Sequence, residues 1–284
     1  MKLASFRIQN KATWGLVDGA RVRDIGAAIP FPDLRTFLEQ QAWGLLASAT
    51  PSAPSCSVDE VRWLPVIPNP EKIFCVGLNY ETHRRETGRA VVEHPTIFVR
   101  FSNTQTGHLT NIVRPRVSTH LDFEGELAVI IGKPGRYIPP EEAFDHVAGF
   151  SCYNDGSVRD WQHHTHQFTP GKNFPHTAGF GPWMVTRDEF TELGSKQIAT
   201  RLNGETVQQA RLGEMIFDIP TLINYCSSFS PLVAGDVIAT GTPGGVGAKR
   251  TPPLWMKPGD IVEVEIDGIG VLRNGIADEE PAGA

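Results

Sequence analysis

The stretch LDFEGELAVIIGK, residues 121–133, joins two glutamates to the longest aliphatic run of the chain. In a β-strand, side chains two residues apart project from the same face, so Glu124 and Glu126 would lie side by side. The unbroken aliphatic run at residues 127–131 is typical of a strand that is buried on both faces. The stretch therefore predicts a core strand over residues 123–131 that begins with two carboxylates.

Two buried carboxylates need a partner charge. At a separation of about 4 Å and an effective dielectric constant near 20, they repel each other by roughly 4 kcal/mol. Asp155 ends a second apolar stretch, AGFSCYND, and would supply a third oxygen ligand. Three carboxylates without a nearby cysteine favour Mg²⁺ or Mn²⁺, with Ca²⁺ as an alternative, over zinc. The pattern alone leaves open a solvated strand face for the glutamates and a simple turn at Asp155.

Short strands separated by turn signals dominate the chain beyond residue 68. Strand-like stretches occupy residues 72–76, 96–101, 147–153 and 236–240. Asn203-Gly204 is a two-residue hairpin signal. Helical periodicity is confined to the segment after Asn79, the segment after Ser157, which would cap it, and residues 218–229. Regular β-α-β alternation is absent, so we expect a β-rich α+β fold and not a doubly wound parallel sheet.

The first 68 residues have a different pattern and are predicted to be a small N-terminal α/β domain with its linker. Two strand-like stretches come first, and Asp33 would cap a helix over DLRTFLEQQAWGLLAS. A proline- and serine-rich connection follows. We place the boundary near residue 68, which gives domains of residues 1–68 and 69–284.

The composition excludes several classes of function. The 284 residues carry a formal net charge of −6, without a run of basic residues, so a nucleic-acid partner is not expected. The aliphatic runs are too short to span a membrane, and the first ten residues lack the apolar segment of a signal peptide. None of the four cysteines forms a C-x-x-C pair. These features predict a cytoplasmic protein with reduced cysteines.

Eight stretches in order along residues 70–276 identify a family resemblance. They are GLNYETHRRETG, LDFEGELAVIIGK, YNDGSVRDWQ, PGKNF, GPWMVTRDEF, LNGETVQQA, GDVIATGTPGGVG and KPGDIVEVEIDGIGVLRN. Together they resemble the fumarylacetoacetate hydrolase superfamily. The resemblance implies a rolled, mixed β-sandwich, a homodimer, and a metal held by Glu124, Glu126 and Asp155.

The same resemblance implies enzymatic chemistry on a small 2-oxo acid through a metal-stabilised enolate. Hydrolysis of a C–C bond in a 2,4-dioxo acid, such as an acylpyruvate or a fumarylpyruvate-like product of aromatic catabolism, is the first expectation. An isomerase or decarboxylase acting on a related 2-oxo diacid, such as a hydroxymuconate or oxaloacetate, is the alternative. His83 and Glu86, spaced i and i+3, would form a general-base pair, and Lys172 in PGKNF would face the substrate carboxylate or the enolate.

Further site residues follow from the motifs. We expect contacts with the substrate from Tyr80, Arg159, Gln162 and Thr242, although Arg159 could instead support the metal carboxylates. Pro170 replaces the arginine common before G-K in this family, which removes one positive charge.

Two other features border these motifs. His163, His164, His166 and His176 cluster in sequence, but their spacing fits no standard zinc site. Residues 83–94 are polar and contain a glycine, so we expect them to form a lid over the substrate.

Overall fold

The computed structural model, which describes residues 1–280, is built around a 12-stranded β-sheet. The main path of this sheet, in spatial order, is β4 (Ser55–Ser57), β3 (Arg21–Asp24), β2 (Lys11–Asp18), β1 (Lys2–Ile8), β14 (Ala178–Thr186), β12 (Val147–Asn154), β11 (Gly125–Ile131), β17 (Val237–Ala239), β6 (Ile73–Gly77) and β7 (Thr96–Arg100). Two short strands attach beside this path. They are β5 (Val61–Trp63), paired with β1, and β8 (Gln105–Thr106), paired with β14.

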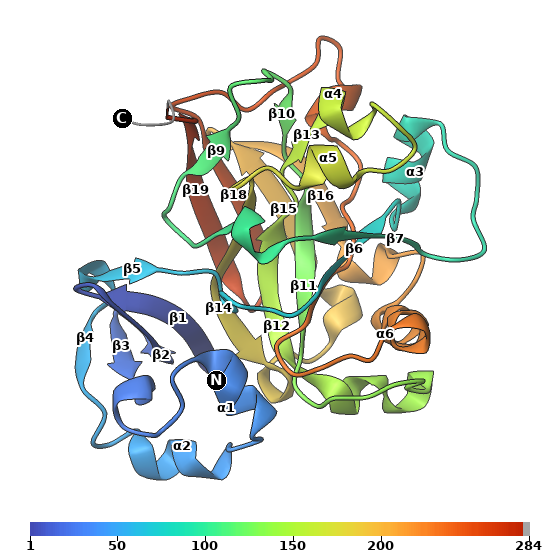
Figure 1. The fold of residues 1–284 in the computed structure, drawn as a ribbon. Helices are drawn as coiled ribbons and strands as arrows, with labels where there is room; N and C mark the ends of the chain where they lie inside the picture. Colours follow the sequence, from blue (N-terminus) through green and yellow to red (C-terminus); the bar gives the residue numbers. More distant parts are fainter. Residues whose placement is uncertain (281–284) are drawn as a thin grey trace.

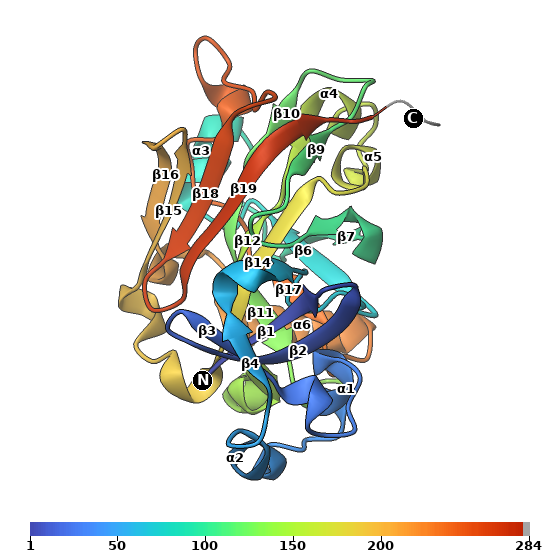
Figure 2. The ribbon, with the colours of Figure 1, turned by 90° about the vertical axis from the view of Figure 1, so that its left-hand side faces the viewer.

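A five-stranded sheet packs against one face of the large sheet (Figures 1 and 2). Its strands, in spatial order, are β16 (Glu205–Arg211), β15 (Gln197–Leu202), β18 (Ile261–Ile266), β19 (Gly270–Asp278) and β9 (Ile112–Arg114). Leu127 and Val129 of β11 meet Ile198 and Val264 of the smaller sheet in one apolar core. The two packed sheets confirm the predicted β-rich α+β sandwich.

The opposite face of β11 is covered by the N-terminal unit. Ala128 and Ile130 belong to a second core that includes Trp14 and Phe37. Strand β1 also pairs with β14, with Leu3 opposite Met184, so the N-terminal strands extend the large sheet. Figure 1 shows this unit in blue beside the rest of the chain. The domain boundary near residue 68 stays a prediction.

The sequence predicted the Asn203-Gly204 turn correctly but misplaced some helix boundaries. The Asn203-Gly204 hairpin forms, and both residues have the positive φ angles, 52° and 85°, that such a turn requires. Asp33 caps a helix as predicted. The single helix expected after it is wrong, because Gln41 with φ of 50° interrupts it, leaving α1 (Leu34–Glu39) and α2 (Gly44–Ala49).

The segment after Ser157 also needs a correction. Ser157 does not cap a helix, because it pairs with Asp122 in a two-stranded sheet formed by β10 (Leu121–Asp122) and β13 (Ser157–Val158). Helix α4 (Arg159–Gln162) therefore begins two residues later, after Val158.

Three short helices lie at the end of the molecule away from the N-terminal unit (Figure 1). They are α3 (Glu81–Thr87), α4 and α5 (Thr169–Lys172). The longer α6 (Ile219–Phe229) begins at Asp218, whose side chain accepts a hydrogen bond from the Thr221 amide. Over residues 1–280, no helix has both the length and the apolar character needed to cross a membrane.

Candidate metal centre and active site

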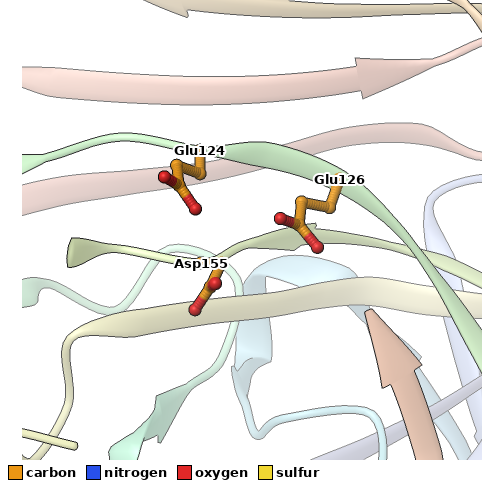
Figure 3. A group of neighbouring side chains, drawn as sticks. All are labelled: Glu124, Glu126 and Asp155. Carbon is orange, nitrogen blue, oxygen red and sulfur yellow. The ribbon is translucent and has the colours of Figure 1, made fainter. Parts of the chain in front are cut away.

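The pairing of β11 with β12 brings three carboxylates together. Gly125 lies opposite Asn154, so Glu124 and Asp155, one residue beyond each, become neighbours. The Asp155 amide donates to the Glu124 carbonyl at 2.8 Å. One oxygen from each of Glu124, Glu126 and Asp155 lies within 4.8 Å of the others, and all three residues are buried. Figure 3 shows the three carboxylates converging on one space. This donor set fits a hard divalent cation.

Lys172 already places one positive charge in this group. Its ammonium lies 2.7 Å from Glu124 Oε2 and 2.6 Å from Asp155 Oδ2. Burial lowers the pKa of Lys172, but Asp155 and Glu124 more than offset this, and the net pKa is raised. The lysine was expected to face the substrate. The structure places it against two carboxylates of the candidate metal centre.

Glu126 is the least compensated of the three carboxylates. The Gly241 amide donates to its Oε2 at 2.9 Å, and among residues 1–280 no cationic side chain forms an ion pair with it. Burial, followed by the charges of Asp155 and Glu124, raises the pKa of Glu126 well above its usual range. A bound cation would therefore stabilise the ionised form of Glu126 more than that of the other two carboxylates.

Arg159 supports the centre from a second side. Its guanidinium pairs with Glu124 Oε1 at 2.6 Å and with Asp122 Oδ2 at 2.8 Å, and it donates to Gln162 Oε1 at 2.8 Å. Burial raises the pKa of Glu124, but Arg159 and Lys172 outweigh it and hold this pKa below its usual value. Of the two roles left open for Arg159, these contacts favour support of the metal carboxylates.

Two further buried residues were missed in the sequence. Arg100, at the end of β7, pairs with Asp155 Oδ1 at 2.5 Å, and its side chain is fully buried. Asp122 accepts from Arg159 and also from the amides of Gly247 and Ala248, at 2.8 and 2.9 Å. A charged residue inside the apolar run TIFVRF was the available signal for Arg100.

The predicted His83–Glu86 pair forms. His83 Nδ1 lies 2.7 Å from Glu86 Oε1, and the histidine is buried. The second oxygen of Glu86 accepts from the Gly245 amide at 2.8 Å, and Arg250 donates to the Gly245 carbonyl at 3.1 Å. Gly245 has φ of +106°, and a Cβ there would lie 2.3 Å from the Val207 carbonyl oxygen. The glycine-rich loop therefore fixes Glu86, which in turn orients His83.

A cavity of about 110 Å³ opens beside the carboxylates. His83, Gln162 and Thr242, all residues of the site motifs, line it. The Thr242 hydroxyl donates to the Gly125 carbonyl at 3.0 Å and accepts from Gln208 at 2.8 Å. Tyr80 does not line the cavity: its ring is 1% exposed and lies in the apolar core.

The cavity has two chemically distinct levels. We call Glu124, Glu126, Asp155, Arg159 and Lys172 the floor. We call Arg89, His163 and Lys249, which line the cavity and are exposed, the mouth.

Within residues 1–280, the four clustered histidines are not in the group of side chains whose spacing could hold a metal. Of the four, His163 alone lines the cavity, while His164 packs on Trp161. In the described part of the chain, residues 1–280, the one group of such side chains that could hold a metal is Glu124, Glu126 and Asp155.

Comparisons with known proteins agree with this architecture. The family model described as "Fumarylacetoacetate (FAA) hydrolase C-terminal" matches residues 72–277. Oxaloacetate tautomerase YisK of Bacillus subtilis is 44% identical over 225 residues, which cover 78% of this chain and 74% of the relative.

Two solved structures match nearly the whole chain. A fumarylacetoacetate hydrolase from Exiguobacterium antarcticum superposes with a TM-score of 0.87 at 34% identity, covering 98% of this chain and all of that one. Maleylpyruvate hydrolase from Sphingobium sp. SYK-6, in complex with manganese(II) and pyruvate, has a TM-score of 0.83 at 27% identity and covers 99% of this chain and all of its own.

Proposed function

The chain belongs to the fumarylacetoacetate hydrolase family, and on this basis we propose that it is a metal-dependent isomerase that interconverts the keto and enol forms of a small 2-oxo diacid such as oxaloacetate. The observation that carries the proposal is the position of His83. The imidazole is buried, lines the same cavity as Glu124 and Glu126, and is held through Nδ1 by Glu86.

Glu124, Glu126 and Asp155 would hold the metal, Mg²⁺ or Mn²⁺. A divalent cation bound there supplies Lewis acidity, which polarises the 2-oxo group of a substrate and acidifies the neighbouring C–H. Their hard oxygen donors, their burial and the uncompensated charge of Glu126 all support this assignment.

His83 would move the proton. The carboxylate of Glu86 favours a proton on Nδ1, so Nε2 is left as the basic nitrogen. Nε2 takes a proton from carbon 3 of the substrate, and the negative charge moves to the 2-oxo oxygen. The imidazolium then returns the proton to that oxygen, which gives the enol. This path breaks no C–C bond and needs no water.

Lys172 and Gln162 would orient the substrate. Both are buried and line the cavity. The Gln162 carbonyl is engaged by Arg159, so its amide NH₂ is the group that remains to donate to a substrate oxygen. Lys172 adds positive charge beside the position of the substrate carboxylate.

Hydrolysis of a C–C bond in a 2,4-dioxo acid is the second candidate. It is supported by the match to maleylpyruvate hydrolase, which extends over 99% of this chain and so includes the N-terminal unit. In this reaction His83 would activate water for attack on the distal carbonyl, and pyruvate would be released.

A substrate panel tests both candidates. The enzyme with Mg²⁺ or Mn²⁺ is given oxaloacetate, acetylpyruvate and maleylpyruvate, and the products are followed by enol absorbance and NMR. We expect accelerated keto–enol exchange of oxaloacetate that is lost in EDTA and in Glu126→Gln. Rapid release of pyruvate from the 2,4-dioxo acids, without faster exchange of oxaloacetate, would favour the hydrolase instead.

A further inference from the structure

Two exposed cations at the mouth of the cavity lack partners. Within residues 1–280, neither Arg89 nor Lys249 takes part in an ion pair, and their side chains donate no hydrogen bond within the chain. The floor cations differ, since Arg159 and Lys172 each pair with two carboxylates. The mouth therefore holds two positive charges that nothing in the described chain neutralises.

The backbone around Arg89 is fixed. Its amide donates to the Arg84 carbonyl at 3.2 Å, and the Arg84 guanidinium donates back to the Arg89 carbonyl at 2.6 Å. Gly88, with φ of 69°, ends α3 directly before it. These contacts hold the main chain of Arg89 beside the cavity and do not involve its side chain.

The turn that contains Lys249 is connected to the floor residue Arg159 through Asp122. Lys249 ends a 3₁₀ turn over Gly247–Lys249, and the first two amides of this turn donate to the Asp122 carboxylate. The same carboxylate accepts from Arg159, which pairs with Glu124. Arg89 and Lys249 thus approach one cavity from two different elements, each with a defined main chain.

His163 completes the mouth. Burial, followed by the positive charges of Arg159, Lys249 and Arg89, lowers its pKa. The ring is therefore neutral near pH 7 and adds a hydrogen-bonding group without adding charge. The cavity lining also includes apolar Val76, Phe98 and Val246, which suit contact with a short hydrocarbon link.

We propose that Arg89 and Lys249 bind the distal carboxylate of the substrate, so that the enzyme prefers 2-oxo acids that end in a second carboxylate. The inference rests on the proposed function, because it requires the 2-oxo acid end to lie at the floor. It goes further by assigning the recognition of the distal carboxylate to two named residues. Charge-assisted contacts of this kind are worth about tenfold in affinity each.

The test is calorimetric binding in the presence of Mg²⁺ with three ligands. Oxalate has no further carboxylate beyond the two that would chelate the metal, so it reports on the floor alone. 2-Oxoglutarate and 2-oxovalerate have the same number of carbons and differ in the distal carboxylate. We expect the wild type to bind 2-oxoglutarate at least about tenfold more tightly than 2-oxovalerate.

Arg89→Met and Lys249→Met remove the charges and keep much of the side-chain length. Each should reduce the preference for 2-oxoglutarate severalfold, and the double variant should abolish it. Affinity for oxalate should not change. Lys257→Met, at an exposed lysine outside the cavity lining, is the matched control and should behave as the wild type.

The outcomes separate the two proposals. If oxalate binds but 2-oxoglutarate has no advantage, or if the advantage survives in the double variant, the assignment of Arg89 and Lys249 is wrong and the proposed function stands. If oxalate does not bind in Mg²⁺, the proposed function fails, and this inference fails with it.

Discussion

The floor and the mouth of the cavity differ in whether their charged side chains are buried and paired. Floor side chains are buried, and all of them except Glu126 form ion pairs of 2.6–2.8 Å. Mouth side chains lie at or just after the ends of short helices, are exposed, and leave two cations without partners in the described chain. Breaking a buried pair costs about 3–5 kcal/mol, whereas exposed substitutions usually stay within about 0.5 kcal/mol. The floor is therefore constrained by stability as well as by chemistry, and the mouth can vary with substrate.

The largest effect is expected at the one floor carboxylate without a cation. Glu126→Gln removes the charge of a proposed metal ligand, and the proposed activity should fall by about 10³- to 10⁴-fold as Lewis-acid assistance is lost. Because the charge of Glu126 is uncompensated, the metal-free protein should not lose stability. Calorimetry with Mn²⁺ and urea unfolding in EDTA measure the two quantities. Glu205→Gln, at an exposed glutamate, is the control. Unchanged Mn²⁺ affinity would remove Glu126 from the metal centre.

Arg100→Met removes a cation that pairs with a floor carboxylate, Asp155, and tests the stability that this ion pair contributes. The substitution leaves Asp155 with one ion pair fewer in a fully buried setting, and should lower the free energy of unfolding by about 3–5 kcal/mol. Arg89→Met at the mouth should change it by less than about 0.5 kcal/mol. Urea unfolding of both variants in EDTA makes the comparison direct. Equal free energies of unfolding for the two variants would mean that the buried ion pair of Arg100 contributes no more stability than the exposed Arg89.

His83→Asn should reduce keto–enol exchange by about 100- to 1,000-fold, because it removes the proposed base. Metal affinity should be unchanged, since His83 is not one of the three ligands. Decarboxylation of oxaloacetate, which needs no base at carbon 3, should fall much less. Parallel losses in both reactions would indicate that the variant disturbs the site as a whole and would count against a proton-transfer role.

The smallest effect on catalysis is expected at His108, which belongs neither to the floor nor to the mouth. Its Nδ1 accepts from the Arg273 amide at 3.0 Å, and burial, with the nearby Arg273 charge, lowers its pKa to about 4. The unfolded chain, with a histidine pKa near 6.5, takes up the proton first, so stability falls as pH drops from about 6.5 towards 4.

Between pH 7 and pH 5 this histidine should account for about 2 kcal/mol of lost stability. His108→Asn keeps an acceptor near the Nδ1 position but does not titrate. Urea unfolding at the two pH values should show a smaller loss for the variant, with its activity at pH 7 unchanged. An identical pH dependence in both proteins would contradict the assignment.

The sequence was most informative where one local rule decides the structure. The alternation around Glu124 and Glu126 fixed which face each side chain takes, and Asn203-Gly204 fixed a hairpin. Contacts set by strand register could not be read in the same way. Arg100 meets Asp155 across 55 positions in sequence, and Ser157 pairs with Asp122 instead of capping a helix. Tyr80 lies in a site motif, but its ring packs in the apolar core, a placement that the motif did not indicate.

The pairing of β1 with β14 has a consequence for the tendency of the chain to aggregate. A catalytic unit expressed without its first 68 residues would present Met184 and Val185 on an unpaired strand, next to the uncovered apolar side chain of Phe180. Exposed edges of this kind recruit strands from other molecules and promote aggregation. We therefore expect that loss of the N-terminal unit would expose this edge and reduce solubility more than it would change the candidate metal centre.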